Sequence, residues 1–474
     1  MACLDPGPPD AAVKVMLNVA GHAPTNQTRF PAFLKFFEPD PAAPVPLTDP
    51  AEIKAKYRYW QRRILVSSIV GYAMYYFVRK NLSVAMPAMG KELGISKADL
   101  GLFLTLHGLL YGVSKFAHGF FGDRANARTL MAAGLLLSAV VNVFFGLSSA
   151  VVAFGILWML NGWVQGMGFP PCARLMTHWF PPKELATKMA FWNTSHSLGA
   201  GLIVVLCGYL VGYGWRLCFF VPAAMAILCS ILLPFALRDT PPSLGLPEVE
   251  GTASPLGSVV ARNDAVEPDF SAFLMKQVFS NPYIWILSVA NFFVYTVRYA
   301  VLDWGPTLLT ETKGVRISHA GWMVGAFECS GMMGMLLGGW LTDKICGGRG
   351  ARLCVFFMAL AGLSILLFWK LPGQSRWLST LLLCCAGFFI YGPQSLVGTV
   401  TANLATKRAA ATAIGLTSIF AYASTVLSGW GLGWLVQRHG WDLGFAGLVS
   451  LAAVGALIFA LAWPAKPHGY AVEG

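Results

Sequence analysis

The chain has 474 residues, of which 56% are hydrophobic and only 12% are charged, and its formal net charge is +12 at pH 7. With a mean hydropathy of +0.60, this composition excludes an ordinary soluble globular protein. The basic residues are spread over many short loops and form no concentrated patch, so the net charge does not indicate a nucleic-acid partner.

The first fifty residues are rich in proline and alanine and contain no apolar run, so they are interpreted as a polar tail and not as a signal peptide. The rest of the chain contains twelve apolar segments, each long enough to cross a bilayer core of about 30 Å as a helix. Their approximate bounds are 61–86, 100–121, 129–148, 151–173, 186–211, 215–237, 282–309, 319–342, 351–370, 376–400, 409–434 and 441–463. None has the alternating pattern of a membrane barrel, so the predicted fold class is an all-α polytopic membrane protein.

A hydrophilic stretch divides the segments into two groups of six. The predicted organisation is an N-terminal tail (1–56), a six-helix bundle (57–237), a central loop (238–280), a second six-helix bundle (281–464) and a C-terminal tail (465–474). Basic residues predominate on the flanks that are cytoplasmic when both termini lie inside. This bias predicts a multi-pass protein of the cytoplasmic (inner) membrane in that orientation.

Two arginines occupy matching places in the two halves. Arg79 and Arg298 are 219 residues apart, and each is followed eight residues later by a proline, Pro87 and Pro306. An arginine at the centre of a bilayer costs about 2.5–3.5 kcal/mol on insertion scales, so its presence indicates a function. Because guanidinium groups present a planar fork of donors, the duplication predicts a phosphate or carboxylate site between pseudo-symmetric halves.

Further polar side chains follow helical spacing within the apolar segments. Lysine and histidine would add donors to a phosphate, while tyrosine supplies a hydroxyl and an apolar face for a carbon skeleton. The predicted phosphate-binding residues are Arg79, Arg298, His196 and Lys115, and the predicted cavity-lining residues are Tyr72, Tyr76, Gln165, Asn193, Tyr295 and Tyr391. Lys80, Asp303 and Glu328 are predicted to form ion pairs between the halves.

Simpler interpretations stay open for several of these residues. Arg79 lies past the middle of its segment, where an arginine can also extend to the outer interface. A hydrogen-bonded structural role is the alternative for His196, although the sequence favours the phosphate site. Lys115 is only four residues from the loop that begins at Gly119, and its role is either in that loop or in the site.

Two loops repeat a pattern of an aspartate followed by basic residues. The first, 119–128, reads GFFGDRANAR and contains Asp123, Arg124 and Arg128; the second, 339–349, reads GWLTDKICGGR and contains Asp343 and Lys344. Asp123 and Asp343 are 220 residues apart, close to the offset of the arginines. The pattern resembles the cytoplasmic loop signature of the major facilitator superfamily, which implies twelve transmembrane helices in two pseudo-symmetric halves and a substrate site at their interface.

No enzyme is predicted, because no nucleophile–base pair emerges from the sequence. The ten cysteines lie mostly singly within apolar segments and show no metal-ligand spacing, so they are interpreted as small buried hydrophobic residues. Neither a metal nor a cofactor is expected.

Several stretches resemble the organophosphate:inorganic phosphate antiporter family of the major facilitator superfamily. They are 71–81 (GYAMYYFVRKN), 111–115 (YGVSK), 123–128 (DRANAR), 165–174 (QGMGFPPCAR), 192–199 (WNTSHSLG), 297–304 (VRYAVLDW) and 391–393 (YGP). The resemblance implies that Arg79 and Arg298 bind phosphate, that His196 assists, and that an external organophosphate is exchanged for internal inorganic phosphate.

Three other stretches are similar to the hexose-phosphate transporter and receptor branch of that family: 57–63 (YRYWQRR), 237–247 (LRDTPPSLGLP) and 281–287 (NPYIWIL). Some members of this branch sense glucose 6-phosphate through a partner histidine kinase. The stretch 413–418 (AIGLTS) departs from this branch, because it lacks the charged pair that is typical of the main hexose-phosphate carrier. The stretch 165–174 in the fourth apolar segment looks more like the glycerol-3-phosphate carrier.

The sequence therefore predicts a membrane antiporter of a sugar phosphate, most simply glucose 6-phosphate, and inorganic phosphate. The alternatives are a hexose-phosphate receptor that signals to a sensor histidine kinase and a glycerol-3-phosphate:phosphate antiporter. A proton-coupled carrier that uses Glu328 and Asp303 for a different anion is a further rival. The lipid bilayer is the other expected partner.

Overall fold

The computed structural model describes residues 32–122, 125–249, 275–346, 349–371, 375–405 and 410–465. The chain divides into a short unit, 1–38, in which the described element is the 3-10 helix η1 (Ala32–Phe37), and a unit that spans 39–474. Every other described element belongs to the second unit, and all of these elements are helical.

The N-terminal part of the second unit contains α2 (Pro50–Phe77), α3 (Leu82–Leu93), α4 (Lys97–Gly122), α5 (Ala127–Leu147), α6 (Val151–Gln165), α7 (Phe169–Trp179), α8 (Pro182–Leu210), η2 (Val211–Tyr213), α9 (Leu217–Ala236) and η3 (Pro241–Leu244). The C-terminal part contains η4 (Met275–Phe279), α11 (Pro282–Lys313), α12 (Ile317–Lys344), α13 (Gly350–Lys370), α14 (Arg376–Leu404), α15 (Ala410–Ala423), η5 (Val426–Gly431) and α16 (Leu432–Leu461). Local signals set several of these bounds: Asn126 and Asn281 cap α5 and α11, and Gly314 ends α11 with a positive φ of 61°.

The first predicted segment, 61–86, is not one helix. α2 ends at Phe77 and α3 begins at Leu82, and Arg79 lies in the irregular turn between them. The turn is held from neighbouring helices, because the side-chain amides of Asn142 and Asn161 both donate to the Val78 carbonyl oxygen at 2.9 Å. These bonds satisfy a buried backbone acceptor that the interrupted helix leaves open.

Gln165 belongs to the same bracing network. Its side-chain amide donates to the Tyr75 carbonyl oxygen at 3.0 Å and to Ser138 Oγ at 2.8 Å, and the residue is only 2% exposed. Both described contacts of the Gln165 amide nitrogen lie within the first half, so its role as a cavity-lining residue stays a prediction. Its amide is used inside the first half to hold the end of α2.

The predicted segments 151–173 and 409–434 are also interrupted. α6 ends at Gln165 and α7 begins at Phe169, with consecutive prolines in the first turn of α7. In the C-terminal half, α15 gives way to the π-helical η5 before α16, and α16 itself is kinked at Gly440, where φ is 77°. This kink lies at the predicted boundary between the last two segments.

Nine helical stretches among the described residues are long and apolar enough to cross a membrane. One of them, Thr412–Leu461, covers two crossings on either side of the Gly440 kink. The hydropathy criterion misses the α2/α3 pair and α12, in which the buried charged residues Arg79, Lys80 and Glu328 lie. Counting these yields the twelve predicted segments.

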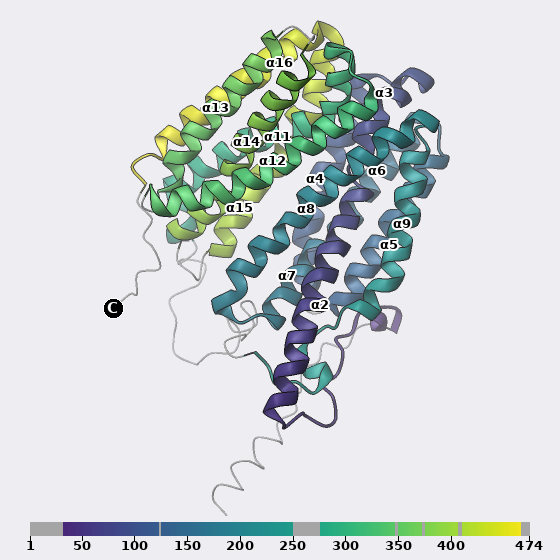
Figure 1. Cartoon of the computed structure of the whole chain (residues 1–474), viewed down its shortest axis with the longest axis vertical. Helices are drawn as coiled ribbons and strands as arrows, with labels where there is room; N and C mark the ends of the chain where they lie inside the picture. The colour runs from purple at the N-terminus through teal and green to yellow at the C-terminus, as the bar shows by residue number, and fades with distance from the viewer. Residues whose placement is uncertain are drawn as a thin grey trace, which may run out of the picture. The chain divides into compact units, whose positions relative to one another are not determined.

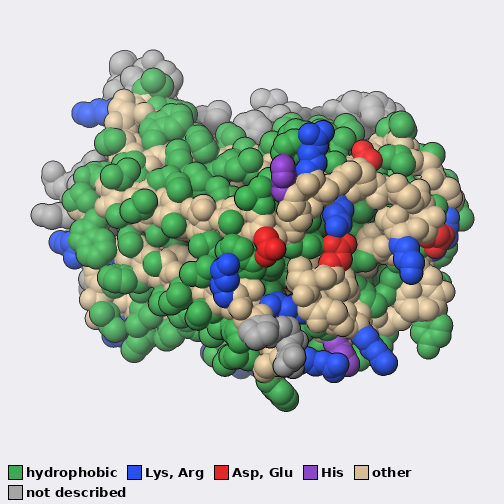
Figure 2. Space-filling view, turned by 90° about the horizontal axis from the view of Figure 1, so that it is seen from above, with side chains coloured by type: hydrophobic (Ala, Val, Ile, Leu, Met, Phe, Trp, Pro, Cys, Tyr) green, Lys and Arg blue, Asp and Glu red, His purple; other side chains and the backbone are tan. Residues whose placement is uncertain are grey.

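The helices form two neighbouring groups, the earlier one purple to teal and the later one green to yellow, which approach each other at the end where α3 lies (Figure 1). The groups contact through α8 with α12, α4 with η5 and α16, and α3 with α11. Glycines allow the closest crossings: a Cβ at Gly101 would lie 2.4 Å from the Gly429 carbonyl oxygen, and one at Gly321 would lie 2.6 Å from that of Val204. Figure 2 looks onto this end, where basic and acidic side chains lie among hydrophobic ones.

Candidate functional site

Arg79 and Arg298 are both buried, at 7% and 3% exposure, and each faces aromatic rings. The Cζ of Arg79 lies 4.0 Å from the ring centroid of Tyr111 on α4. The Cζ of Arg298, in the middle of the unbroken α11, lies 4.5 Å from the ring centroid of Tyr391 on α14. The sequence repeat therefore places both arginines in comparable aromatic surroundings, although their backbones differ.

A circuit of aromatic rings connects the two arginines across the halves. On one side, the Tyr111 and Tyr422 centroids are 5.1 Å apart, and Tyr422 lies 6.5 Å from Tyr295, whose ring is 5.9 Å from the Arg298 Cζ. On the other side, His196 lies between Tyr76 and Tyr391, at 6.0 Å and 6.3 Å. We call these six rings the aromatic circuit; its members are Tyr76, Tyr111, His196, Tyr295, Tyr391 and Tyr422.

Three residues of this region were not among the predicted site residues: Tyr111, Tyr299 and Tyr422. The Tyr299 ring lies 5.4 Å from the Arg298 Cζ, and it directly follows that arginine in the chain. Tyr422 stands in an apolar segment, where only its helical spacing from Ser418 and Thr425 marks a polar face.

The guanidinium of Arg298 has unused donors. Its Nε and Nη2 atoms are buried and have no hydrogen-bond partner. These two nitrogens form one edge of the planar fork, the arrangement that binds two oxygens of a phosphate or carboxylate together. Leaving such donors unpaired in the interior is costly, so a buried free edge indicates a place for an anion.

Carboxylates do not neutralise the arginines directly. Within the part of the chain that the structure describes, Arg79, Arg298 and Lys115 have no carboxylate oxygen within 4.0 Å. Together with Lys80 they bring four positive charges to the region, against two negative charges from Asp303 and Glu328. With these groups in their ordinary ionisation states, the excess matches the charge of a phosphate dianion.

Lys115 and His196, the other predicted phosphate ligands, lie next to the circuit or within it. The Nζ of Lys115 lies 3.9 Å from the Phe169 ring centroid and 5.8 Å from that of Tyr422. The Nδ1 of His196 lies 3.0 Å from the hydroxyl of its neighbour Ser197. His196 thus packs beside Tyr76, a ring that contacts Arg79. Lys115 lies near Tyr422, which packs against Tyr111, the other ring that contacts Arg79.

Two predicted cavity-lining residues, Tyr72 and Asn193, belong to helices of the N-terminal half. The Tyr72 hydroxyl is 3.5 Å from that of Tyr111, and its ring packs 4.8 Å from Trp192. Asn193 is half-buried on α8, about one helical turn before His196.

The predicted inter-half ion pairs have different outcomes. Lys80 Nζ lies 2.5 Å from Asp303 Oδ1, and both side chains are buried between α3 and α11. Glu328, however, accepts a hydrogen bond from the Tyr391 hydroxyl of its own half, and its Oε2 has no hydrogen-bond partner. No described lysine or arginine is within ion-pair distance of Glu328 in this conformation, and its assignment to an inter-half ion pair stays a prediction.

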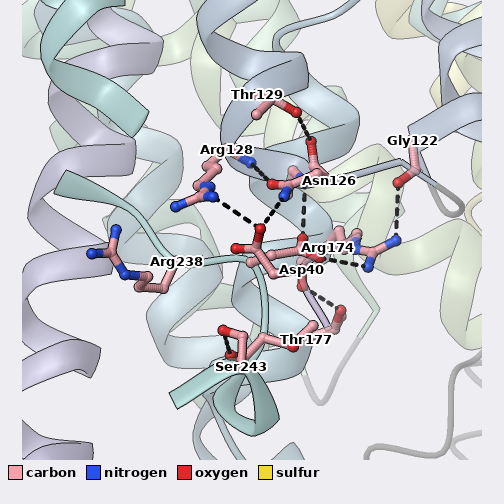
Figure 3. Close-up of polar contacts among 12 residues, drawn as sticks. Asp40, Gly122, Asn126, Arg128, Thr129, Arg174, Thr177, Arg238 and Ser243 are labelled. Atoms are coloured by element: carbon pink, nitrogen blue, oxygen red, sulfur yellow. Dashed lines mark hydrogen bonds and ion pairs between the residues drawn. The ribbon is translucent and has the colours of Figure 1, made fainter. Parts of the chain in front are cut away.

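The predicted loop motifs are only partly described. Asp123 and Arg124, and the side chain of Asp343, lie outside the described residues, and Lys344 is exposed at the end of α12. Arg128 Nη2 donates to Asp40 Oδ1 at 2.9 Å, and Asn126 donates to the same oxygen (Figure 3). The sequence did not predict Asp40 as a partner, because it lies in the polar tail.

A second carboxylate joins the start of α5 to the middle of α7. Asp239 Oδ1 accepts from the Ala127 backbone N–H at 2.9 Å, and its Oδ2 lies 3.2 Å from Arg174 Nη2. Burial raises the pKa of the Asp239 carboxyl, an effect that Arg174 opposes. The Asp40 and Asp239 carboxylates thus fix the start of α5 at the end of the molecule opposite to α3.

Two half-bundles of membrane-length helices with buried cations between them define a polytopic membrane protein with the two-bundle architecture that is typical of secondary transporters. Residues 68–429 match the family model described as Major Facilitator Superfamily. The chain therefore belongs to the major facilitator superfamily, as the loop pattern predicted.

Relatives with named functions align with nearly the whole chain. It is 39% identical to the "Probable hexose phosphate transport protein" of Chlamydia pneumoniae, covering 91% of this chain and 97% of the relative. It is 38% identical to the glycerol-3-phosphate transporter of Bacillus subtilis (strain 168), covering 91% and 98%. The membrane sensor protein UhpC of Escherichia coli (strain K12) is 38% identical, with 89% and 95% covered. The predicted resemblance to organophosphate carriers and receptors is confirmed.

Solved structures show the same fold at low identity. A bacterial homologue of the human lysosomal transporter Spinster, in an inward-facing and unoccupied conformation, superposes with a TM-score of 0.68 at 18% identity, covering 85% of this chain and 96% of that one. A single-residue mutant of the nucleoside transporter NupG superposes with a TM-score of 0.65 at 13% identity, covering 85% and 99%.

Proposed function

We propose that the chain is an antiporter that exchanges a sugar phosphate, most simply glucose 6-phosphate, for inorganic phosphate by alternating access. The observation that carries the proposal is the free Nε/Nη2 edge of Arg298, which is buried beside the aromatic circuit that leads to Arg79. The hexose-phosphate and glycerol-3-phosphate relatives support an organophosphate as the substrate.

In this proposal the phosphate is held from both halves. Arg298 contributes its free edge, Arg79 contributes from the turn after α2, and Lys115 and His196 add donors. With the site empty, the excess positive charge resists the approach of the halves that occlusion requires. A bound phosphate offsets this repulsion, so reorientation occurs with substrate on board and transport becomes an obligatory exchange.

The moving bodies are the two six-helix bundles, 57–237 and 281–464, linked by the central loop. The orientation that the basic flanks predict places both termini and the Asp40–Arg128 loop in the cytoplasm. The glycine crossings between the halves lie toward the opposite end. In the proposed cycle this is the conformation open to the cytoplasm.

A receptor function is the second candidate, and the UhpC relative favours it. Both functions use the same site, because a receptor that signals to a histidine kinase must also bind the sugar phosphate. The glycerol-3-phosphate relative makes that smaller organophosphate the alternative substrate.

Counterflow in proteoliposomes tests the proposal. Vesicles preloaded with labelled inorganic phosphate are exposed to glucose 6-phosphate, glycerol 3-phosphate or phosphoenolpyruvate. Fast efflux of labelled phosphate with glucose 6-phosphate supports the proposed antiporter. Faster efflux with glycerol 3-phosphate would identify glycerol 3-phosphate as the preferred substrate instead. Saturable binding of glucose 6-phosphate without any efflux of phosphate would contradict the transport function and favour the receptor function.

A further inference from the structure

One exposed stripe of α2 changes from basic to apolar within a single helical turn. Its residues are spaced by three or four positions, so they share one face of the helix. Arg58 and Arg62 are exposed at the tail-proximal end, and Val66 and Val70 follow with 59% and 50% exposure. Such a stripe fits a lipid, whose head is charged and whose chains are apolar.

A shallow groove of about 650 Å³ follows the basic part of this stripe. It is lined by Ala55, Arg58, Tyr59, Arg62, Arg63, Val66 and Ser67, and the lining contains no carboxylate. Among the described residues, neither Arg58 nor Arg62 has a carboxylate within ion-pair distance. Their charges are therefore available to an external anion.

Arg63 forms the fixed wall of the groove. Its Nε and Nη2 donate to the carbonyl oxygens of Ala236 and Phe235 at the end of α9, at 3.2 Å and 3.0 Å. Its Nη1 donates to the Tyr59 hydroxyl at 2.5 Å. These bonds fix Tyr59 beside Arg58 and Arg62, an aromatic residue of the kind enriched at membrane interfaces.

The surroundings place the apolar end of the stripe against lipid tails. α2 packs between α8 and α9 and lies at the front of the view in Figure 1. On either side, exposed apolar residues continue the surface: Leu198 and Leu202 on α8, and Ile231, Leu232 and Phe235 on α9. Arg62 is thus at the depth where the hydrocarbon-facing surface ends.

We propose that this groove binds the phosphodiester of an anionic phospholipid, with its headgroup between Arg58 and Arg62 and an acyl chain along Val66 and Val70. The site is separate from the transport site and does not depend on the proposed function. Basic residues at the cytoplasmic border of a membrane helix attract anionic headgroups, and the adjoining valines supply the contact that a free phosphate cannot use.

Native mass spectrometry of the purified full-length chain tests the proposal. The probes are phosphatidylglycerol, phosphatidylcholine with the same acyl chains, and glycerol 3-phosphate as the free headgroup. Wild type is expected to retain phosphatidylglycerol in preference to phosphatidylcholine, and millimolar glycerol 3-phosphate should not displace it. Equal retention of the two lipids, or displacement by the free headgroup, would overturn the lipid site.

Variants locate the binding. Removing both charges with Arg58→Gln and Arg62→Gln is expected to weaken phosphatidylglycerol retention about fivefold to thirtyfold, because each basic residue contributes separately. The double variant Arg58→Lys and Arg62→Lys keeps the charge and should retain most of the binding. Arg376→Gln with Arg438→Gln removes the same charge from exposed positions outside the groove and should change nothing. An equal loss in this control pair, or wild-type retention in the glutamine pair, would refute the assignment.

Discussion

Lys80 and Asp303 join the two halves through a buried ion pair, with Nζ 2.5 Å from Oδ1. Each partner is close in sequence to one arginine of the candidate site, since Lys80 follows Arg79 directly and Asp303 lies five residues after Arg298. The contact therefore couples the positions of the arginines to the closure of the interface between α3 and α11.

Asp303→Asn should be strongly destabilising, by about 3–5 kcal/mol, because it leaves the Lys80 charge buried without its partner. The double change Lys80→Met with Asp303→Asn should recover much of that loss. Melting temperatures in detergent measure both. Glu311→Gln is the matched control, because the Lys97–Glu311 pair also joins the halves but is more exposed, and its loss should cost about 0–1 kcal/mol. Equal shifts for Asp303→Asn and Glu311→Gln would contradict this account.

Asn161→Leu should destabilise the turn that carries Arg79. The substitution removes one of the two side-chain donors to the Val78 carbonyl oxygen, leaving Asn142 alone to satisfy it. A cost of about 1–3 kcal/mol is expected for disturbing this buried network, together with weaker phosphate binding. Thermal unfolding and phosphate titration check the two effects. Ser418→Ala, at an exposed hydroxyl bonded within its own helix, should alter neither stability nor binding if the network is the cause.

Helix number, the two halves and the paired arginines can be predicted from hydropathy, spacing and the repeat, which are properties of the sequence itself. The break at 78–81 cannot, because the donors that stabilise it lie 64 and 83 residues further along. The bond from Gln165 to the Tyr75 carbonyl oxygen could not be predicted for the same reason, since a bracing amide and a cavity amide look alike in sequence. Tyr422 was missed because one polar tyrosine in an apolar helix carries a weak signal.

Gly101→Val should oppose the conformation described, because a Cβ there already meets the Gly429 carbonyl oxygen at 2.4 Å. The side chain would force α4 and η5 apart, so the equilibrium should shift away from this state and exchange should slow. Accessibility of an engineered cysteine at the α4–η5 crossing, read by maleimide labelling, measures the shift. Gly212→Ala serves as the control, since a Cβ at that position would have nothing within 4 Å. Unchanged labelling in Gly101→Val would contradict the inference that α4 and η5 are in close contact in this conformation.

Tyr422→Phe should preserve phosphate binding, whereas Tyr422→Leu should weaken it about tenfold, or about 1.4 kcal/mol. The reason is that Tyr422 connects Tyr111 and Tyr295 through ring contacts, and those rings lie beside the arginines. Phosphate titration of the purified variants distinguishes the contribution of the Tyr422 ring to phosphate binding from that of its hydroxyl. If phenylalanine and leucine weaken binding equally, the ring contact is not the operative feature.

Phosphate self-exchange in proteoliposomes, compared between wild type, Arg79→Lys and Arg298→Lys, tests the central claim most directly. Lysine keeps the charge but cannot present the two-donor edge, so each variant should lose at least about a hundredfold in exchange, equivalent to about 2.7 kcal/mol, while its melting temperature stays near that of wild type. Near-normal exchange in the Arg298→Lys variant would contradict the assignment of its free edge to phosphate.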